Sequence, residues 1–391
     1  MSVAAKEHKQ SAAEVMDQMN ADVAKLHAWI RTQANAPAQR PWFADTSEAV
    51  GELARGRVAA NQMKMLAHRW RWREIYPFLS KIGEIARNAE EKPIETTDRQ
   101  GILLTNPGLG GRLQVTNSIR CAIAIYNPGD IAPAHVHSPN ASRTILSDKG
   151  GYTNVEGERC ECRRGDIVFT PNGTWHDHGV EADGATTIWQ DGLDMLLVNQ
   201  LDANFYAVHP DTVQKSNYPL NDTAQVYGGP GLLPVGGEAW SKPYSPLFKY
   251  EWARTYETLT RAAAATDGSP YDGIMMQYVN PATGGPVMKT LGAHIQLLRG
   301  GERTKAHRHT GSVVYTCAKG SGYSIIAGKR YDWSKSDIFV VPSWAWHEHA
   351  NASDREDAVL FSFTDIPSML ALGLYREEAL TENGGHQKAA H

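Results

Sequence analysis

From residue 96 onward, most of the chain alternates apolar and polar positions, a pattern typical of half-buried β-strands. Residues 121–126 and 294–298 are clear examples, and Gly, Pro and Asn turns separate such stretches. Residues 11–30 and 58–86 instead carry helical spacing with few turn signals. The pattern therefore predicts a mainly β protein with an α-helical N-terminal extension that packs outside the first β-rich unit.

The β-rich part of the chain contains an internal repeat. His-x-His at 135–137 is followed by Trp-His-Asp-His at 175–178, and the second copy has His-x-His at 307–309 followed by Trp-His-Glu-His at 346–349. The offset is 172 residues at the first motif and 171 at the second, and Gly, Tyr, Asp and Pro landmarks between them keep register. Such a repeat predicts two copies of one antiparallel barrel.

The repeat and the turn-rich segments set the expected domain boundaries. Pro, Gly and Asn accumulate over 211–237, which indicates a connection between two domains. We expect a final helix over 369–380 and a frayed tail over 381–391. The five expected regions are a helical N-terminal region 1–95, an N-terminal barrel 96–210, a linker 211–245, a C-terminal barrel 246–370, and a C-terminal helix and tail 371–391.

The composition agrees with a folded protein and excludes several partners. Apolar residues make up 41% of the 391 residues, and 39 basic residues stand against 43 acidic ones. A net charge of −4 offers no basic face for nucleic acid or an anionic membrane. The chain has no 18-residue apolar run and no signal-peptide core, so we expect a soluble cytoplasmic protein. Four cysteines are too few for a disulfide framework, so we expect reduced thiols.

The candidate chemistry lies in the histidines of the first copy. His135 and His137 are two residues apart in a predicted strand, so their side chains project from the same face of the sheet. His176 follows 39 positions after His137, on a strand that a hairpin around 150–157 could bring alongside. Three neutral imidazoles bind Zn, Cu, Fe or Ni well. The alternative is that these histidines decorate a surface strand or fill a core with satisfied hydrogen bonds.

Two motifs of the first copy resemble the characteristic motifs of cupins, namely Gly129-x5-His135-x-His137 and Gly165-x5-Pro171-x-Gly173-x2-His176. Cupins are small double-sheet barrels of the jelly-roll type. The duplicated arrangement, over about 70–363, resembles the bicupin gentisate 1,2-dioxygenase and salicylate 1,2-dioxygenase family. The resemblance implies two cupin (double-stranded β-helix, jelly-roll) barrels in a homo-oligomer, commonly a tetramer.

The resemblance also implies a reaction. Enzymes of this family depend on Fe(II) and use O2 to cleave an aromatic hydroxy acid between the carbons that bear the carboxyl and the ortho-hydroxyl group. Many metal cupins add a Glu after His-x-His, but here Ala141 and Ser142 occupy that stretch, so no fourth protein ligand is evident. Three open coordination positions would accept the substrate carboxylate, its ortho-hydroxyl and dioxygen. Zinc has no redox chemistry, so the dioxygenase interpretation requires iron.

Substrate contacts are expected in the first barrel, which we take to be the active one. Arg143, in the strand after His137, has a fixed charge and a planar fork that suit a substrate carboxylate. The comparable stretch after His309, residues 312–315, has no cation. The resemblance assigns Arg143 to holding the aromatic acid and Arg99 to a second contact. The alternative is that Arg143 is an exposed charge on an edge strand.

Two further positions bear on catalysis and specificity. His178 lies two residues beyond His176, on the same predicted face, where it could hydrogen-bond the substrate hydroxyl or bound oxygen, and the resemblance supports this role. Ala124 stands eleven residues before His135, where the family usually places a substrate-contacting Gln, and the second barrel keeps Gln296. A methyl in place of an amide predicts a ring substituent other than the 5-hydroxyl of gentisate, such as 5-nitro, 5-amino or 5-halo.

The sequence leaves two other functions open. The same three histidines would serve a Zn or Mn hydrolase or isomerase, and a bicupin can also be a non-catalytic storage or ligand-binding protein. Elemental analysis and oxygen uptake separate these alternatives. His307, His309 and His347 of the second copy also have ligand spacing. Because no cation accompanies them, we expect no metal there.

Overall fold

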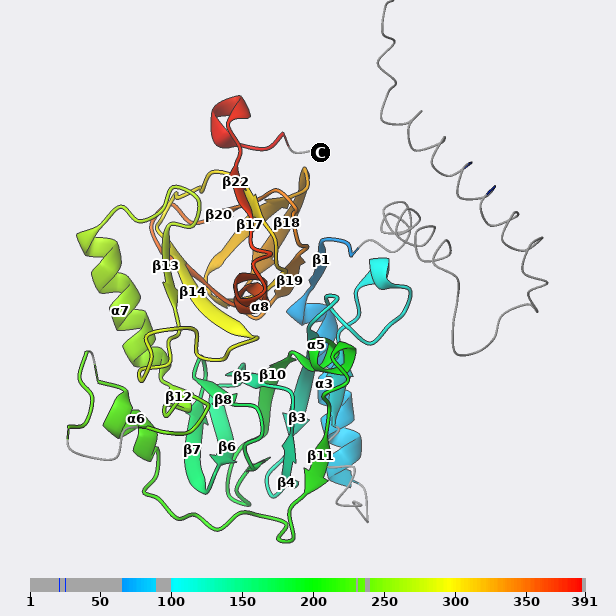
Figure 1. The fold of residues 1–391 in the computed structure, drawn as a ribbon, viewed down its shortest axis with the longest axis vertical. Coiled ribbons are helices and arrows are strands. Elements are labelled where there is room, and N and C mark those ends of the chain that lie inside the picture. Colours follow the sequence, from blue (N-terminus) through cyan, green and yellow to red (C-terminus); the bar gives the residue numbers. More distant parts are fainter. Residues whose placement is uncertain are drawn as a thin grey trace, which may run out of the picture. The chain divides into compact units, whose positions relative to one another are not determined.

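The computed structural model describes residues 65–88, 100–229, 231–235 and 240–388, together with residues 21 and 25. Arg99, the helix expected over 11–30 apart from the helical residues 21 and 25, and the start of the helix expected over 58–86 lie outside the described residues. The elements described below all belong to one compact unit, Met65–His391. Two barrels, each with two antiparallel sheets, account for most of them (Figure 1).

The first barrel contains eleven strands. They are β2 Gly101–Leu103, β3 Arg120–Tyr126, β4 Ile131–His137, β5 Ala141–Ile145, β6 Lys149–Val155, β7 Glu158–Arg163, β8 Ile167–Thr170, β9 His176–Gly179, β10 Thr187–Leu193, β11 Tyr206–Val208 and β12 Lys249–Tyr250. One sheet has the order β12-β8-β5-β10-β3-β2 and the other the order β11-β4-β9-β6-β7. The alternation along β3 separates two faces, because Ile123 joins a core shared with the second barrel while Ala124 packs against the interior of the first.

The second barrel repeats this plan. Its strands are β1 His68–Trp70, β13 Ile274–Gln277, β14 Gly292–Leu298, β15 His307–His309, β16 Val313–Lys319, β17 Ser321–Ile326, β18 Lys329–Ser334, β19 Ile338–Val341, β20 His347–Asn351, β21 Ala358–Thr364 and β22 Glu377–Ala379. The sheet orders are β1-β19-β16-β21-β14-β13 and β18-β17-β20-β15-β22. These sheets confirm the mainly β, two-barrel fold that the repeat predicts.

A strand and a helix at the start of each repeat connect the two barrels. β1 pairs with β19 of the second barrel, and the helix that follows it, α3 (Trp72–Asn88), packs on β3 of the first. β12 pairs with β8 of the first barrel, and α7 (Trp252–Ala265) packs on β13 and β14 of the second. The backbone N–H of Trp72 donates to Asp337 at 2.7 Å, and that of Trp252 donates to Asp166 at 2.9 Å. Each helix therefore begins at an aspartate of the barrel that its preceding strand joins.

The packing of α3 follows from its sequence. Its buried residues Ile75, Leu79 and Gly83 are spaced four apart and form one stripe. A Cβ on Gly83 would lie 2.8 Å from Cδ1 of Ile125, so the glycine lets the helix approach β3 closely. Helix α3 confirms the predicted helical spacing from residue 72 onward.

Three expected boundaries require correction. Residues 68–70, expected as helix, form β1 because they continue the edge of a sheet of the second barrel. Residues 249–250, expected in the C-terminal barrel, complete a sheet of the first barrel as β12. The helix expected over 369–380 is wrong in extent: α8 (Ile366–Ala371) ends before Gly373, which has φ 68°, and the following segment pairs with β15 as β22.

The expected linker 211–245 includes an ordered helix, α6 (Asp222–Tyr227), that is attached to the first barrel. The backbone N–H and the hydroxyl of Thr223 donate to one carboxylate oxygen of Glu158, at 3.0 and 2.9 Å. Burial raises the pKa of Glu158 to about 6, although these two hydrogen bonds lower it. The linker is thus bound to the outer strand β7 along part of its length.

A shared apolar core joins the two barrels. It includes Ile123 and Phe169 of the first barrel and Ile295 and Phe361 of the second, all of them buried. The outward faces of the two six-stranded sheets supply these side chains, since each strand alternates between the barrel interior and this core. The fold thereby fixes the orientation of the interior-facing residues in both barrels.

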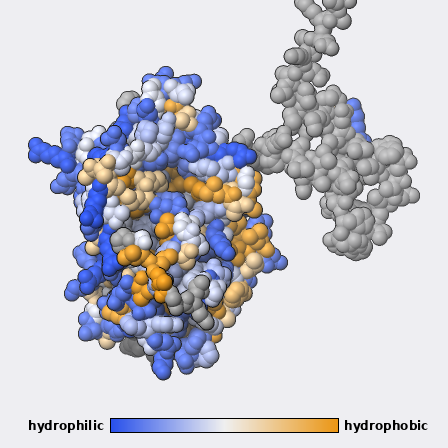
Figure 2. All heavy atoms as spheres, turned by 60° about the vertical axis from the view of Figure 1, so that its left-hand side comes forward, coloured by the Kyte–Doolittle hydropathy of each residue, from blue (hydrophilic) through white to orange (hydrophobic). Residues whose placement is uncertain are grey.

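The surface and the cysteines agree with the composition. On the face shown in Figure 2, hydrophobic residues form patches that hydrophilic residues interrupt. No helix in the described part of the chain is long and apolar enough to cross a membrane. All four cysteines are free and buried, and burial raises the pKa of both Cys121 and Cys162 to about 12.

Candidate metal centre

Three histidines converge inside the first barrel. Strands β4 and β9 are antiparallel neighbours, and their register places His135 opposite His176. His137, two residues further along β4, projects from the same face. The His176 ring centroid lies 4.3 Å from that of His135 and 4.6 Å from that of His137. One ligand nitrogen from each ring lies within 4.8 Å of the others, so the three predicted ligands are brought together.

Backbone hydrogen bonds determine which nitrogen each ring offers to a metal. Nδ1 of each ring faces a carbonyl oxygen two residues away: His135 with Pro133 at 2.7 Å, His137 with Pro139 at 2.8 Å and His176 with Thr174 at 2.9 Å. A carbonyl oxygen only accepts, so each Nδ1 carries the proton and donates it. Each Nε2 is then an unprotonated lone pair, which is the form of imidazole that binds a metal.

Burial keeps the rings of His137 and His176 neutral. It lowers the pKa of His137 to about 4, with a further contribution from the adjacent His135. The pKa of His176 is well below its usual value because the ring is enclosed and because His135 and His137 lie beside it. Among the described residues, the group of possible donor side chains at this site holds these three histidines and no carboxylate. Such a set fits a divalent transition metal with open coordination positions.

Arg143 is buried beside the three histidines and is not an exposed edge charge. Its strand β5 lies between β8 and β10 in the interior of a sheet. Nε lies 3.0 Å from Oδ1 of Asp191, while Nη1 donates to Oγ1 of Thr153 at 3.0 Å. Nη1 and Nη2 also lie 3.0 and 3.3 Å from the two ring nitrogens of His178. A neutral imidazole accepts at only one nitrogen, so only one of the two His178 contacts is a hydrogen bond, and at least one N–H of Nη2 has no acceptor within the described residues.

His178 occupies the interior face that its spacing predicts. Its ring centroid lies 5.4 Å from that of His176 and 5.8 Å from that of His135. Burial and then the charge of Arg143 hold the pKa of His178 well below its usual value. Because a guanidinium only donates, His178 must present an unprotonated nitrogen to it. His178 is therefore a neutral ring next to the candidate metal ligands.

Ala124 also faces the barrel interior. It lies opposite Trp189 of β10 and packs against the apolar cluster that contains Trp189 and Tyr126. Gln296, its counterpart in the second barrel, is buried and donates from Nε2 to the backbone carbonyl of Asp272 at 2.8 Å. The two barrels thus differ at this position, with a methyl group in the first and an amide in the second.

Two residues of this site, Asp191 and Tyr206, are not among those predicted from the sequence. Asp191 pairs with Arg143 and also accepts from Nε1 of Trp189 at 3.1 Å. Alternation along β10 could have placed Trp189 and Asp191 on one interior face. Tyr206 stacks on His135 with ring centroids 5.4 Å apart, but its strand β11 has three residues and carries no readable pattern.

The second barrel also brings its three histidines together. Its strands β15 and β20 place His307 opposite His347, with their Nε2 atoms 2.8 Å apart. One ligand nitrogen from each of His307, His309 and His347 lies within 4.8 Å of the others. Tyr315 stands at the position of Arg143 and stacks on Phe339 with centroids 4.9 Å apart. The second barrel therefore has no arginine at this position, as the sequence indicates, but its three histidines are still close enough together to bind a metal.

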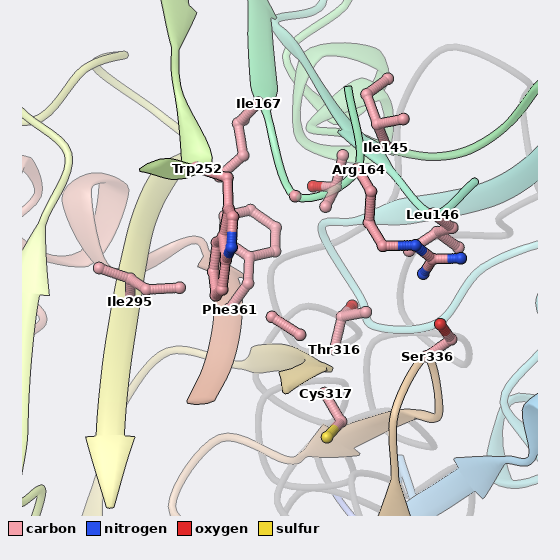
Figure 3. Close-up of a pocket in the computed structure, with 13 residues that line it drawn as sticks. Ile145, Leu146, Arg164, Ile167, Trp252, Ile295, Thr316, Cys317, Ser336 and Phe361 are labelled. Carbon is pink, nitrogen blue, oxygen red and sulfur yellow. The ribbon is translucent and has the colours of Figure 1, made fainter. Parts of the chain in front are cut away.

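A separate hollow lies between the barrels and is not part of either histidine group (Figure 3). Trp252 and Phe361 lie near each other on one side of it, and Arg164 lies across from them. Thr316 also lines it and donates to Oε1 of Gln190 across the interface at 2.6 Å. No histidine contributes to its lining, so this hollow belongs to the packing between the barrels.

Two jelly-roll barrels with three convergent histidines in each define a bicupin with the ligand sets of a metalloprotein. The family model of the cupin domain matches residues 122–194 and 294–364, one region in each barrel. The order of strands in the sheets and the match to the cupin family model therefore both identify the protein as a bicupin.

The chain belongs to the family of bicupin ring-cleaving 1,2-dioxygenases, which makes it a dioxygenase. It is 38% identical over 321 residues to 5-aminosalicylate 1,2-dioxygenase of Comamonas sp, covering 81% of this chain and 83% of that one. It is 36% identical over 310 residues to gentisate 1,2 dioxygenase 1 of Aquipseudomonas alcaligenes, covering 79% and 86%. The crystal structure of a salicylate 1,2-dioxygenase from Pseudaminobacter salicylatoxidans matches with a TM-score of 0.75 at 28% identity, over 91% of this chain and 97% of that one. The predicted family, fold class and type of enzyme are confirmed.

Proposed function

We propose that this chain is an Fe(II)-dependent dioxygenase that cleaves gentisate or a 5-substituted salicylate, for example 5-nitrosalicylate. O2 is the second substrate, and the bond that breaks joins the carboxyl-bearing and ortho-hydroxyl-bearing ring carbons. The observation that carries this proposal is the convergence of His135, His137 and His176 beside Arg143 and His178 in one barrel interior. Both oxygen atoms of O2 enter the ring-opened product.

The donor set supports iron(II) as the metal. Three unprotonated Nε2 atoms, each fixed by a backbone hydrogen bond on Nδ1, would hold the ion at the N-terminal barrel. Iron supplies the electron transfer between an aromatic ring and dioxygen that zinc does not. The role of the protein's own side chains is to position the reactants and to provide charge.

Arg143 and His178 are the side chains that we assign to the substrate. An N–H of Arg143 Nη2 that has no acceptor in the described part of the protein binds the substrate carboxylate, while the ion pair with Asp191 orients the guanidinium. A fixed carboxylate also fixes the ring, which removes part of the entropic barrier to reaction. His178 hydrogen-bonds the ortho-hydroxyl group or the incoming oxygen from the adjacent position on β9. Arg99, assigned by resemblance, belongs to the same proposal.

Ala124 supports a ring substituent other than hydroxyl. A methyl group in the barrel interior leaves space and offers no hydrogen bond, whereas the amide expected at this position would favour a 5-hydroxyl group. The relative at 38% identity is a 5-aminosalicylate 1,2-dioxygenase, and the salicylate 1,2-dioxygenase structure has been obtained in complex with gentisate. On the methyl group of Ala124 and the 5-aminosalicylate relative alone, we place 5-amino- and 5-nitrosalicylate ahead of gentisate.

Oxygen consumption tests this function. The protein is reconstituted anaerobically with Fe(II) and given gentisate, salicylate and the 5-amino, 5-nitro and 5-chloro analogues. We expect one O2 consumed per substrate with loss of aromatic absorbance, and no uptake by His176→Ala. Absence of uptake with every analogue, or full activity of a protein that contains zinc and no iron, would refute the proposal.

Assembly and location complete the proposal. We propose a homo-oligomer, a tetramer by resemblance to the family, located in the cytoplasm. Size-exclusion chromatography with light scattering measures the assembly, and a mass of one chain at micromolar concentration would contradict it. Fractionation of the native cells tests the location, and recovery of the protein outside the cytoplasmic fraction would contradict that part.

A further inference from the structure

We propose that the C-terminal barrel holds a second divalent transition-metal ion, bound by His307, His309, His347 and the carboxylate of Asp272. This site is separate from the proposed dioxygenase centre, and the inference does not depend on the proposed substrate. From the sequence alone we expect no metal at this site, because the second barrel has no arginine at the position of Arg143. A missing arginine, however, bears on substrate binding and not on metal binding.

The ring orientations of the second group match those of a ligand set. Nδ1 of His347 lies 3.0 Å from the carbonyl oxygen of Ala345, and Nδ1 of His309 lies 3.2 Å from that of Thr310. Both rings therefore keep an unprotonated Nε2. Nε2 of His307 lies 2.8 Å from Nε2 of His347. Adjacent ligands of an octahedral ion with bonds of about 2.1 Å would be ~3.0 Å apart, so one ion can take both nitrogens.

Asp272 offers a carboxylate that the first group lacks, but it lies outside the set of three ring nitrogens that are within 4.8 Å of one another, so it would complete the site by moving closer to the bound ion. Its Oδ1 lies 3.6 Å from Nε2 of His307, on the ligand side of that ring. Its Oδ2 accepts from the hydroxyl of Ser269 at 3.0 Å, and its backbone carbonyl accepts from the amide of Gln296 at 2.8 Å. These two hydrogen bonds leave Oδ1 facing His307. A fourth protein ligand would occupy one of the coordination positions that the first barrel leaves open.

Glu377 occupies the outer side of His307. Its Oε1 lies 3.4 Å from Nδ1 of His307, which has no hydrogen-bond partner within the described residues, and its Oε2 accepts from the hydroxyl of Tyr375 at 3.1 Å. A carboxylate on the far nitrogen of a ligand histidine orients the ring and raises its basicity. Glu377 lies on β22, the counterpart of β11, which carries Tyr206 in the first barrel.

The interior of the second barrel does not suit an aromatic acid. Tyr315 replaces Arg143, and stacked rings of Tyr315, Phe339 and Trp333 fill the space next to it. All three side chains are buried. The second ion would therefore bind without a substrate and would connect β15, β20 and the segment that carries Asp272. We assign it a structural role in the C-terminal barrel.

Metal stoichiometry tests the proposal. Metal-free protein is loaded anaerobically with excess Fe(II), freed of unbound iron by gel filtration, and analysed for iron per chain. We expect two equivalents in the unaltered protein and one in each of His176→Ala and His347→Ala. One equivalent in the unaltered protein that His347→Ala leaves unchanged would overturn the proposal, because the His307–His347 contact would then be only a hydrogen bond. Loss of oxygen uptake alone, with two equivalents retained, would count against the proposed function and not against this site.

Milder variants guard against loss of the fold. Asp272→Asn keeps the shape of the side chain, and we expect it to weaken the second equivalent about tenfold or more in a competition titration against a chelator. Asp267→Asn, an exposed aspartate of the same segment, is the matched control and should retain both affinities. Equal iron affinities for Asp272→Asn and Asp267→Asn would remove Asp272 from the site.

Discussion

Arg143 and Asp191 face each other across β5 and β10, with Nε 3.0 Å from Oδ1, inside the first barrel. Their side chains are 6% and 15% exposed, so the pair is largely removed from water. Removing one member of a buried pair leaves the other charge without compensation, which costs more than the pair itself contributes. The orientation of the arginine that we assign to the substrate therefore depends on Asp191, a residue that no sequence motif marks.

Asp191→Asn should destabilise the protein and weaken substrate binding together. We expect a loss of about 3 kcal/mol in the free energy of unfolding, because the guanidinium stays buried without its counter-ion. Urea denaturation measures this loss, and steady-state oxygen uptake measures kcat/KM. Asp332→Asn breaks an exposed pair with Arg330 and should change stability by less than about 1 kcal/mol. Equal stability of Asp191→Asn and Asp332→Asn would show that the buried ion pair contributes no more to the free energy of unfolding than the exposed pair does.

His178→Gln should lower turnover without removing iron. Its ring lies beside the ligands but is not one of them, so iron content should match that of the unaltered protein. Loss of a hydrogen-bonding or proton-transferring group should reduce kcat about 100-fold. Iron analysis and oxygen uptake on the same sample separate the two effects. A variant that loses one iron equivalent would mean that His178 supports the ligands instead of the substrate.

Ala124→Gln should shift preference toward gentisate. A restored amide can hydrogen-bond a 5-hydroxyl group, which is worth about 1 kcal/mol, and it takes space from bulkier substituents. We expect the ratio of kcat/KM for gentisate over 5-nitrosalicylate to rise about tenfold. Ala124→Val adds volume without a hydrogen bond, so it should lower both values without raising the gentisate ratio to the same extent. An unchanged ratio in Ala124→Gln would show that this position does not contact the substituent.

The metal-free protein should lose stability as pH falls from about 6.5 toward 4. The pKa of His137 is lowered from 6.5 to about 4, so the unfolded chain takes up a proton in this interval before the folded chain does. Each such histidine costs up to about 1.4 kcal/mol per pH unit. Glu158, with a raised pKa of about 6, acts in the opposite direction, but the pKa values of His176 and His178 are lowered as well.

Urea denaturation in a chelating buffer between pH 7 and pH 5 checks this dependence. The midpoint should decrease with falling pH, and His137→Gln should flatten the slope because it removes one of the titrating groups. A midpoint that stays constant or increases as pH falls would contradict the assignment of buried neutral rings.

The sequence predicts the ligand triad because the signal is local and repeated. His135 and His137 need only the alternation of a strand, and the duplicated spacing to His176 adds an independent constraint. The same reasoning places His178 and Ala124 on the interior face, where the structure has them. The two-residue periodicity of a strand is thus sufficient to predict which of these side chains face the interior of the barrel.

The missed features depend on contacts between distant segments. Asp191 becomes a partner of Arg143 only once β10 is paired with β5, and no short motif specifies that register. The incorrect final helix arises because Gly373 ends α8 and β22 then gains its hydrogen bonds from β15, a strand almost 70 positions earlier. Asp272 likewise approaches His307 from a loop whose position depends on Gln296. Local propensity carries no information on such pairings.

β1 and β12 each pair with one barrel and lead into the other, so the two halves of this molecule depend on each other. Each sheet that forms the shared core receives one edge strand from a segment leading into the opposite half. A cut within residues 211–245 would leave both fragments with an unpaired edge and an uncovered apolar face. Neither barrel is therefore structurally complete without the segment that leads into the other, and we expect neither to fold when it is expressed alone.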